Sequence, residues 1–356
     1  MSEPMADDFI NGLAARVKDH AARKVPLRIR GGGSKDFLGA PGAGEPLDVS
    51  AYAGIVAYEP RELVLTVRAG TRLADIESAL AAEGQMLPFE PPRFGEAATI
   101  GGTVACNLSG PRRPYAGAAR DFVLGARIVN GSGEDLSFGG RVIKNVAGYD
   151  VSRLMAGAFG TLGILTELSF KVLPRPPAEA TLAFELDEAA MIAKVNQWAG
   201  QPLPLSATAW ESGVLRIRLS GAASAVKAAR AKLGGNEVAD GPAYWEALRE
   251  QKLAFFDASK PLWRLSVAQT AAPLGLAMPQ LIEWGGGQRW LVGDAVLRAM
   301  REAAQKGRGH ATRFRGGDRA GGTFHPLAPA IAKIHRRLKD AFDPAGILNP
   351  GRLDNF

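Results

Sequence analysis

Two short glycine-rich segments in the first third of the chain combine residue types that bind phosphate groups. Gly31-Gly32-Gly33-Ser34-Lys35 directly follows the strand-like run 26–30. Successive glycine N–H groups can form a concave surface for an anion, and Arg30 or Lys35 could add positive charge. In Thr99-Ile100-Gly101-Gly102-Thr103, two hydroxyl groups flank a glycine pair, which suits a diphosphate. Each segment alone could equally be a turn.

A third segment, 148–170, contains several glycines, so parts of its backbone carry no side chain. Gly157, Gly160 and Gly163 lie among apolar residues and are followed by the strand-like run 164–170. Glycine allows close approach to the main chain, so this spacing predicts a chain that lies flat against something large. None of the three segments is a Walker loop or a Rossmann fingerprint, because the glycine spacing and the order of elements differ. Together they favour a large phosphate-bearing cofactor without identifying it.

Reactive side chains are few. The chain has one cysteine, Cys106, so it can form neither an internal disulfide nor an iron–sulfur cluster of its own. We expect Cys106 to be a small buried side chain with no neighbour that lowers its pKa. Its histidines are His20, His310, His325 and His335. No two of them are spaced to bind a metal from one element, so we expect no metal site and assign no catalytic residue.

The elements that would position these residues alternate between strands and helices, which predicts an α+β fold. In the first half we expect a helix over 9–20, strands over 26–30, 63–67 and 164–172, and a strand pair around the Asn130-Gly131 turn. A helix after Gly70 would be capped by Thr71 and would bury Leu73, Ile76 and Leu80. The proline-rich stretch 173–180 reads as a linker.

The second half changes in composition. Alternation over 214–219 predicts a strand, and 223–233, 296–305 and 331–342 predict helices, the last ending at Asp343-Pro344. We therefore expect three regions: 1–173, 181–310 as a smaller α+β cap, and 311–356 as a segment that returns to the first region.

Composition and charge limit the class of protein. The 356 residues are 46% hydrophobic and 22% charged, as in soluble globular proteins. No run approaches the roughly 18 apolar residues of a membrane span, and no secretory signal begins the chain, so we expect a cytoplasmic location. Between residues 298 and 340, eleven Lys or Arg face three Asp or Glu. This basic region could dock a partner, attract an anionic substrate or be a solvated surface; aromatic residues for stacking nucleic-acid bases are not interleaved with it.

Five motifs in order resemble the vanillyl-alcohol-oxidase-type (PCMH-type) FAD-binding family: Arg30–Ser34, Ala98–Ala105, Lys144–Asp150, Gly160–Ile164 and the C-terminal Phe342–Arg352. The resemblance implies a two-subdomain FAD-binding fold with a smaller α+β cap. Some relatives tether the flavin to a histidine where this chain has Ser34, which implies non-covalent FAD. The FAD-binding residues implied are Arg30, Gly31, Gly32, Gly33, Ser34, Lys35, Pro88, Thr99, Ile100, Gly101, Gly102, Thr103, Lys144, Asn145, Gly148, Tyr149, Asp150, Gly160, Thr161, Gly163, Ile164 and Asn349. A side chain on Gly32 would then weaken FAD binding, and we expect little loss of fold.

Within this family, residues 141–176 and 314–327 are most similar to an FAD-binding subunit of bacterial glycolate oxidases. That resemblance implies oxidation of glycolate to glyoxylate together with a second flavoprotein subunit and an iron–sulfur subunit, with membrane contact only through the complex. Related 2-hydroxy-acid dehydrogenases carry two close histidines around a Gly-Asp-Gly-Asn core, of which Gly316-Gly317-Asp318 is only a partial match. His325 is the one histidine expected near the flavin.

Two alternatives remain open. One is a self-sufficient FAD-dependent oxidase or dehydrogenase of another small alcohol or 2-hydroxy acid, with Arg313, Arg315 or Arg319 pairing with a carboxylate. The other is a flavin-relay or scaffold subunit without turnover. We expect no nucleic-acid partner.

Overall fold

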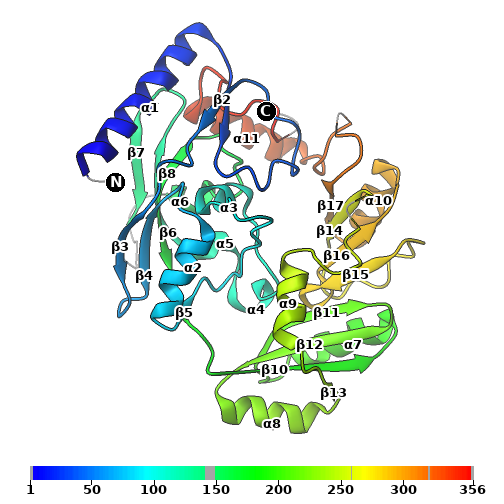
Figure 1. Cartoon of the computed structure of the whole chain (residues 1–356). Helices are drawn as coiled ribbons and strands as arrows, with labels where there is room; N and C mark the ends of the chain where they lie inside the picture. Colours follow the sequence, from blue (N-terminus) through cyan, green and yellow to red (C-terminus); the bar gives the residue numbers. More distant parts are fainter. Residues whose placement is uncertain (1–2, 141–148, 258, 320, 354–356) are drawn as a thin grey trace.

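The structure is a computed structural model that describes residues 3–140, 149–257, 259–319 and 321–353. We call residues 3–174 the N-terminal part, residues 178–315 the cap and residues 321–353 the C-terminal segment. Figure 1 shows the N-terminal part beside the cap, with the C-terminal segment folded back onto the N-terminal part. The boundary expected between residues 310 and 311 falls inside a strand of the cap, β17 (His310–Arg315).

The N-terminal part is built on a five-stranded antiparallel sheet in the order β3-β4-β8-β6-β7. Its strands are β3 (Ile55–Glu59), β4 (Val64–Arg68), β6 (Val123–Val129), β7 (Asp135–Gly139) and β8 (Ile164–Lys171). Its helices are α2 (Leu73–Ala82), α3 (Ile100–Cys106), α4 (Arg113–Ala116), α5 (Ala119–Phe122) and α6 (Val151–Leu154). Strand β4, beside the central strand β8, is buried along its whole length, so the core lies between this sheet and α2.

Helix α2 confirms the predicted apolar face, because Leu73, Ile76 and Leu80 are buried together. The predicted cap residue is wrong: α2 begins after Arg72, and no side chain caps it. The hydroxyl of Thr71 instead donates to Arg68 O at 2.6 Å, within the turn that precedes the helix.

Two small sheets complete the N-terminal part. Helix α1 (Glu3–Arg23) leads into β1 (Leu27–Arg30), which pairs in parallel with β2 (Glu45–Asp48). In the second sheet, β5 (Gln85–Met86) pairs antiparallel with β9 (Leu173–Pro174). The predicted linker 173–180 therefore already contains strand residues, since a proline is tolerated at the edge of a two-stranded sheet.

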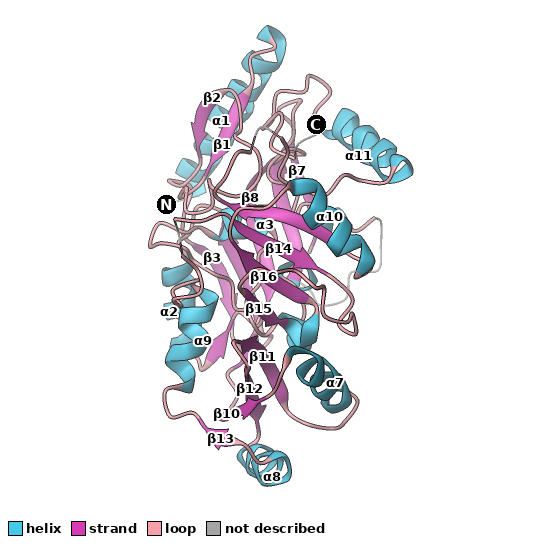
Figure 2. Ribbon diagram, turned by 90° about the vertical axis from the view of Figure 1, so that its right-hand side faces the viewer, coloured by secondary structure: helices cyan, strands magenta, loops and turns pink. Residues whose placement is uncertain are grey.

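The cap is an eight-stranded antiparallel sheet in the order β13-β10-β12-β11-β15-β16-β14-β17. Besides β17, its strands are β10 (Ala178–Glu185), β11 (Leu205–Glu211), β12 (Val214–Gly221), β13 (Asn236–Glu237), β14 (Leu262–Ser266), β15 (Gln280–Glu283) and β16 (Gln288–Val292). Helices α7 (Glu188–Ala199), α8 (Ala223–Leu233) and α10 (Leu297–Lys306) cover one face (Figure 2). The other face carries α9 (Gly241–Arg249), and a 3-10 turn (Trp284–Gly286) joins β15 to β16.

Aromatic rings fill the contact between the cap and the N-terminal part. Phe314 of β17 packs against Phe37 and Phe94, with ring centroids 5.5 and 6.2 Å apart. An ion cluster adds to this contact: Glu90 of the N-terminal part accepts from Arg112 and, at 2.8 Å, from Arg218 of the cap. Burial acts to raise the pKa of Glu90, but the two arginines outweigh it and the pKa is lowered. The two parts are therefore joined by both apolar and ionic contacts.

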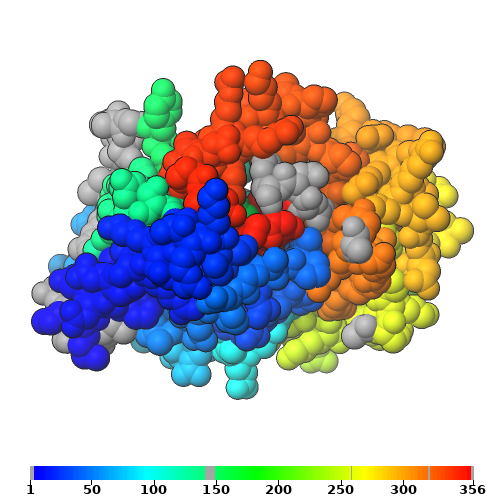
Figure 3. Space-filling view, turned by 90° about the horizontal axis from the view of Figure 1, so that it is seen from above, coloured from blue at the N-terminus to red at the C-terminus, as the bar shows by residue number. Residues whose placement is uncertain are grey.

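The C-terminal segment returns through α11 (Pro329–Phe342). Lys339 is its one buried residue and donates to Asp343 Oδ2 at 2.6 Å and to the main-chain oxygens of Thr161 and Leu348, each at 2.8 Å. Beyond it, Leu27 N donates to Ile347 O, so the two ends of the chain lie side by side (Figure 3). None of the described helices is long and apolar enough to cross a membrane.

Candidate cofactor-binding site

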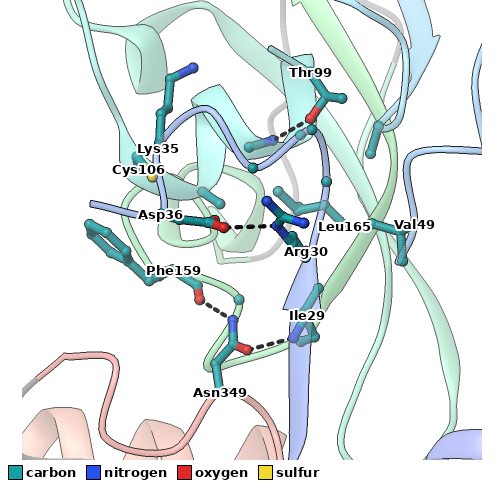
Figure 4. A pocket seen from close by; sticks show the side chains of 18 of the residues that line it. Ile29, Arg30, Lys35, Asp36, Val49, Thr99, Cys106, Phe159, Leu165 and Asn349 are labelled. Carbon is teal, nitrogen blue, oxygen red and sulfur yellow. Dashed lines mark hydrogen bonds and ion pairs between the residues drawn. The ribbon is translucent and has the colours of Figure 1, made fainter. Parts of the chain in front are cut away.

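A groove lies where four separate segments of the chain meet (Figure 4). These are the loop after β1, the start of α3, the loop before β8, and the end of the C-terminal segment. The groove holds about 730 Å³ of space, its open mouth included. Twelve of the residues predicted to bind FAD line it: Arg30, Gly31, Gly32, Gly33, Ser34, Lys35, Thr99, Gly101, Gly102, Gly160, Gly163 and Asn349. The structure thus brings the first two glycine-rich segments together with part of the third.

The loop Gly31–Lys35 offers unused main-chain donors. Within the described part of the chain, none of its five N–H groups donates a hydrogen bond to another residue. Five consecutive free amides along one wall of a groove are suited to the oxygens of a phosphate or diphosphate. Gly33 has φ +71, a conformation that L side chains rarely adopt.

The glycines of this loop lack side chains, and close packing within the protein requires that absence. A Cβ on Gly32 would lie 1.4 Å from Ala97 O, and one on Gly31 would lie 2.6 Å from Thr99 Oγ1. Our expectation that a side chain on Gly32 would leave the fold intact is therefore wrong. The glycines let the loop pack directly against residues 97–99, while the same residues line the groove.

The second glycine-rich segment uses its donors internally. Thr99 caps α3 by accepting from Gly102 N at 3.2 Å, and Gly101 N donates to Ala69 O at 2.8 Å. These N–H groups are therefore occupied, unlike those of the loop Gly31–Lys35. Gly102 has open space where a Cβ would point, apart from Thr99 Oγ1 at 3.2 Å.

Asn349 connects three of the segments that form the groove. Its Oδ1 accepts from Ile29 N and its Nδ2 donates to Phe159 O, each at 2.7 Å (Figure 4). A Cβ on Gly160 would lie 2.8 Å from Asn349 Nδ2, and one on Gly163 would lie 2.8 Å from Ile128 Cδ1. The predicted flat stretch thus packs against Asn349 and the central sheet on one side, while the groove lies on the other. Asn349 positions the walls of the groove with its polar atoms.

The remaining predicted residues lie elsewhere. Pro88, Ile100, Thr103, Thr161 and Ile164 are buried in the N-terminal part and do not line the groove. Tyr149 is 96% exposed, and Asp150 caps α6 by accepting from Arg153 N. Lys144, Asn145 and Gly148 fall outside the described residues. Contact with FAD stays a prediction for these ten residues, as it does for the twelve that line the groove.

Charged and thiol groups stand at one end of the groove. Lys35 is buried, and its Nζ donates to Ser34 Oγ and Arg93 O, both at 3.2 Å. Burial lowers the pKa of Lys35, with Cys106 and Glu250 acting in the opposite direction. Arg30 is paired with Asp36 at 2.8 Å.

Cys106 is half-buried on the groove wall and has cationic neighbours, so the prediction of a buried side chain with no neighbour that lowers its pKa is wrong. Burial raises the pKa of the Cys106 thiol, although Lys35 and Arg352 act to lower it. Because the net shift is upward, the neutral thiol is favoured and Cys106 is not an activated nucleophile.

Sequence reasoning missed the apolar walls of the groove. They are formed by Ile29, Val49, Ala69, Ala105, Phe159 and Leu165. Nothing marks these residues in the sequence, because they resemble any other buried apolar residue. Arg352 also lines the groove and could have been found, since it belongs to the C-terminal motif that contributed Asn349.

The arginines expected near a substrate and the histidine expected near the flavin do not line the groove. Arg319 donates to the main-chain oxygens of Asp36, Phe37 and Gly39, and Arg315 donates to Gln251. Arg313 lies over the Trp263 ring. His325 contacts Ala311 N and Gln305 beside α10. Among the described residues, no group of three His, Cys, Asp or Glu could hold a metal ion.

The groove fits FAD in its chemistry. FAD combines an apolar ring system with a diphosphate, and the groove combines apolar walls with five free main-chain N–H groups. The residues present are therefore suited to this cofactor, with the loop Gly31–Lys35 as the candidate diphosphate contact.

Comparisons with known proteins agree. Residues 10–139 match the family described as "FAD binding domain", and residues 327–353 match "FAD linked oxidases, C-terminal domain". The chain is 49% identical over 346 residues, 97% of each chain, to glycolate oxidase subunit GlcE of Escherichia coli. It is 33% identical over 181 residues to glycolate oxidase subunit GlcD of Bacillus subtilis, covering 50% of this chain and 38% of that one.

Solved structures share the fold. p-Cresol methylhydroxylase with bound substrate matches with a TM-score of 0.70 at 17% identity, over 96% of this chain and 87% of that one. Alkyldihydroxyacetonephosphate synthase matches with a TM-score of 0.67 at 17% identity, over 95% of this chain and 74% of that one. The predicted α+β, PCMH-type fold with a cap is confirmed. With nearly half of its residues identical over 97% of its length, the chain belongs to the GlcE family of FAD-linked oxidoreductases, and its cofactor is FAD.

Proposed function

We propose that this chain is the FAD-carrying, GlcE-type subunit of a glycolate oxidase that converts glycolate to glyoxylate. The observation that carries the proposal is the run of free amides at Gly31–Lys35 in a groove whose walls are apolar. Full-length similarity to GlcE supports glycolate as the substrate, and partial similarity to GlcD fits a complex in which a second flavoprotein subunit shares this fold. A third, iron–sulfur subunit would carry electrons onward, because this chain has too few cysteines for a cluster.

The chain's own residues bind and orient the cofactor. FAD, when bound, supplies two-electron oxidation. The N–H groups of Gly31–Lys35 would hold its diphosphate, and Lys35 would add positive charge at the end of the loop. Asn349 keeps Ile29 and Phe159 at a fixed separation, so the groove is formed before the cofactor enters. The apolar walls exclude water from the ring system.

FAD should be held without a covalent bond, since Ser34 stands where tethered relatives have histidine. Acid denaturation followed by centrifugation tests this point: yellow colour in the supernatant is expected, and colour that stays with the pellet contradicts it.

An absorbance spectrum recorded before and after anaerobic addition of glycolate tests the function. The purified chain should show a flavin spectrum, and the flavin should bleach when the complete complex receives glycolate. A complex that contains this chain with bound flavin but does not react with glycolate would overturn the proposal. We place the complex in the cytoplasm, at the inner membrane only through its other subunits.

A further inference from the structure

A second cavity lies between the cap sheet and the N-terminal part, and its lining residues differ from those of the FAD groove. The space between its walls is about 340 Å³, its opening included, and the walls include Phe94, Leu108, Arg264, Glu283, Trp290 and Phe314. Phe94 and Leu108 pack in one cluster with Cys106 and Phe159, which line the FAD groove. The cavity is thus next to the groove, on the side of the cap.

Arg264 brings a positive charge into this cavity. Side chains alternate along a strand, so β14 directs Trp263 toward α10 and Arg264 toward the N-terminal part. In the part of the chain that the structure describes, the guanidinium of Arg264 makes no ion pair and no hydrogen bond; it lies over the Phe314 ring, 5.4 Å from the centroid. Burial lowers the pKa of Arg264 to about 10, and Arg113 acts in the same direction.

Arg113 is a second cation near the first. It lies 4.5 Å from the centroid of the Trp284 ring and forms no ion pair with any described residue. Burial lowers the pKa of Arg113. Burial also lowers the pKa of His310, and Arg264 and other charged neighbours act in the same direction. The positive charges of Arg264 and Arg113 repel one another, and Asp121 offsets part of the charge of Arg113. A bound anion would relieve the remaining repulsion.

Glu283 offers an acceptor on another strand of the same sheet face. Its Oε2 accepts from Trp290 Nε1 at 2.6 Å and from Gln288 Nε2 at 3.0 Å. Its Oε1 has no hydrogen-bond partner among the residues described. Burial raises the pKa of Glu283 to about 7. Since β15 and β14 are separated by β16, the two main chains lie about 10 Å apart. Trp290 of β16 is paired in register with Arg264 and lines the cavity together with Arg264 and Glu283.

We propose that this cavity binds the small 2-hydroxy acid on this chain, with Arg264 pairing with the carboxylate and Glu283 Oε1 accepting a hydrogen bond from the hydroxyl. The inference rests on the proposed function for the substrate class. Arg264 takes the place of Arg313, Arg315 and Arg319 as the expected partner of the carboxylate. The side chains of those three arginines stack on Trp263 or bind oxygens within the protein.

Calorimetric titration of the FAD-loaded full chain with two diacids tests the site. Tartronate carries a 2-hydroxyl group, and malonate is the same diacid without it. Wild type should bind tartronate more tightly than malonate. Arg264→Gln should weaken both by about tenfold to a hundredfold, because a charge-assisted pair is lost. Arg264→Lys should recover part of the affinity. Glu283→Gln, at pH 8, should reduce the preference for tartronate. It should not weaken malonate binding, because it removes a negative charge that repels the diacid.

Arg313→Gln is the matched control, since Arg313 lies on the other face of the same sheet, and it should bind both diacids like wild type. Flavin content shows whether each variant is folded. Equal affinity of folded wild type and Arg264→Gln for both diacids, or no binding by wild type, overturns the inference. If the complex assembled with Arg264→Gln still oxidises glycolate at the wild-type rate, the inference fails while the proposed function stands. If the wild-type complex does not oxidise glycolate but tartronate binding depends on Arg264, the proposed function fails alone.

Discussion

The FAD groove and the cap cavity offer opposite kinds of groups to a ligand. In the groove the free donors belong to the main chain, at Gly31–Lys35, while side chains such as Asn349 hold chain segments together. In the cap cavity the free groups are side-chain charges, Arg264 and Glu283, carried on nearby strands of a rigid sheet. A main-chain site requires glycines in consecutive positions, whereas a side-chain site requires only that separate strands point residues the same way.

The largest expected effect on stability concerns Lys339, which anchors the C-terminal wall of the groove. Lys339→Met removes three hydrogen bonds and leaves Asp343, only 1% exposed, without its counter-charge. Breaking a buried pair in this way costs about 3–5 kcal/mol of the free energy of unfolding. Urea unfolding should show this loss together with reduced flavin content.

Arg336→Met is the matched control, because Arg336 is an exposed cation on the same helix. It should change the free energy of unfolding by no more than about 0.5 kcal/mol. Equal stability of the two variants would mean that Lys339 does not anchor the return of the chain.

The cap cavity should make stability depend on pH through Glu283. Burial, and secondarily Glu90, raise the pKa of Glu283 from 4.5 to about 7 in the folded protein. Between these values the folded state holds a proton that the unfolded state has released, so the free energy of unfolding falls as pH rises from about 4.5 to 7. A shift of this size corresponds to a loss on the order of 3 kcal/mol.

Glu283→Gln cannot ionise and should lose this part of the pH dependence. The measurement is urea unfolding of both proteins at pH 5 and pH 8, compared as a difference so that other titrating groups cancel. A variant whose stability changes with pH as wild type does would show that Glu283 is ionised in the fold throughout this range.

The contrast between the main-chain groups of the groove and the side-chain charges of the cap cavity also explains which features the sequence could predict. Helices at 223–233 and 331–342 were predictable because their apolar periodicity is strong, and α8 (Ala223–Leu233) and the end of α11 match. The glycine-rich segments located the groove because tight chain packing leaves no other residue type possible at Gly32. Arg264 was missed because its significance depends on strands β14, β16 and β17 being neighbours, a long-range arrangement that no local pattern encodes. A charged residue on an otherwise apolar strand was the only available signal.

Two glycine substitutions distinguish the packing role of glycine within the protein from its role in FAD binding. Gly32→Ala should destabilise the protein, by roughly 1–3 kcal/mol, since the loop must move away from Ala97 O. Gly102→Ala meets only Thr99 Oγ1 and lies in α3, where alanine is favoured by up to about 1 kcal/mol. Thermal unfolding without added FAD, and FAD affinity measured separately, distinguish the effects. Gly32→Ala should impair both properties and Gly102→Ala only FAD affinity. Equal thermal stability of the two variants would contradict this division.

The smallest expected effect concerns a surface that belongs to neither site. Helix α11 exposes Lys333, Arg336 and Arg337 beside Ile331 and Ile334, which are 45% and 53% exposed. Mixed basic and apolar exposure on one helix is typical of a docking surface, and we expect an acidic partner protein of the complex to bind there. Reversing Arg336 and Arg337 to Glu should slow association and weaken co-purification roughly tenfold at low salt, with a smaller difference at high salt because these charges are screened.

Lys227 and Lys232 on α8, also exposed, serve as the control when reversed to Glu, and FAD content should stay unchanged in both variants. If co-purification of the α11 variant equals that of the α8 variant at both salt concentrations, α11 is only a solvated surface; if its flavin content falls, the helix supports the groove instead.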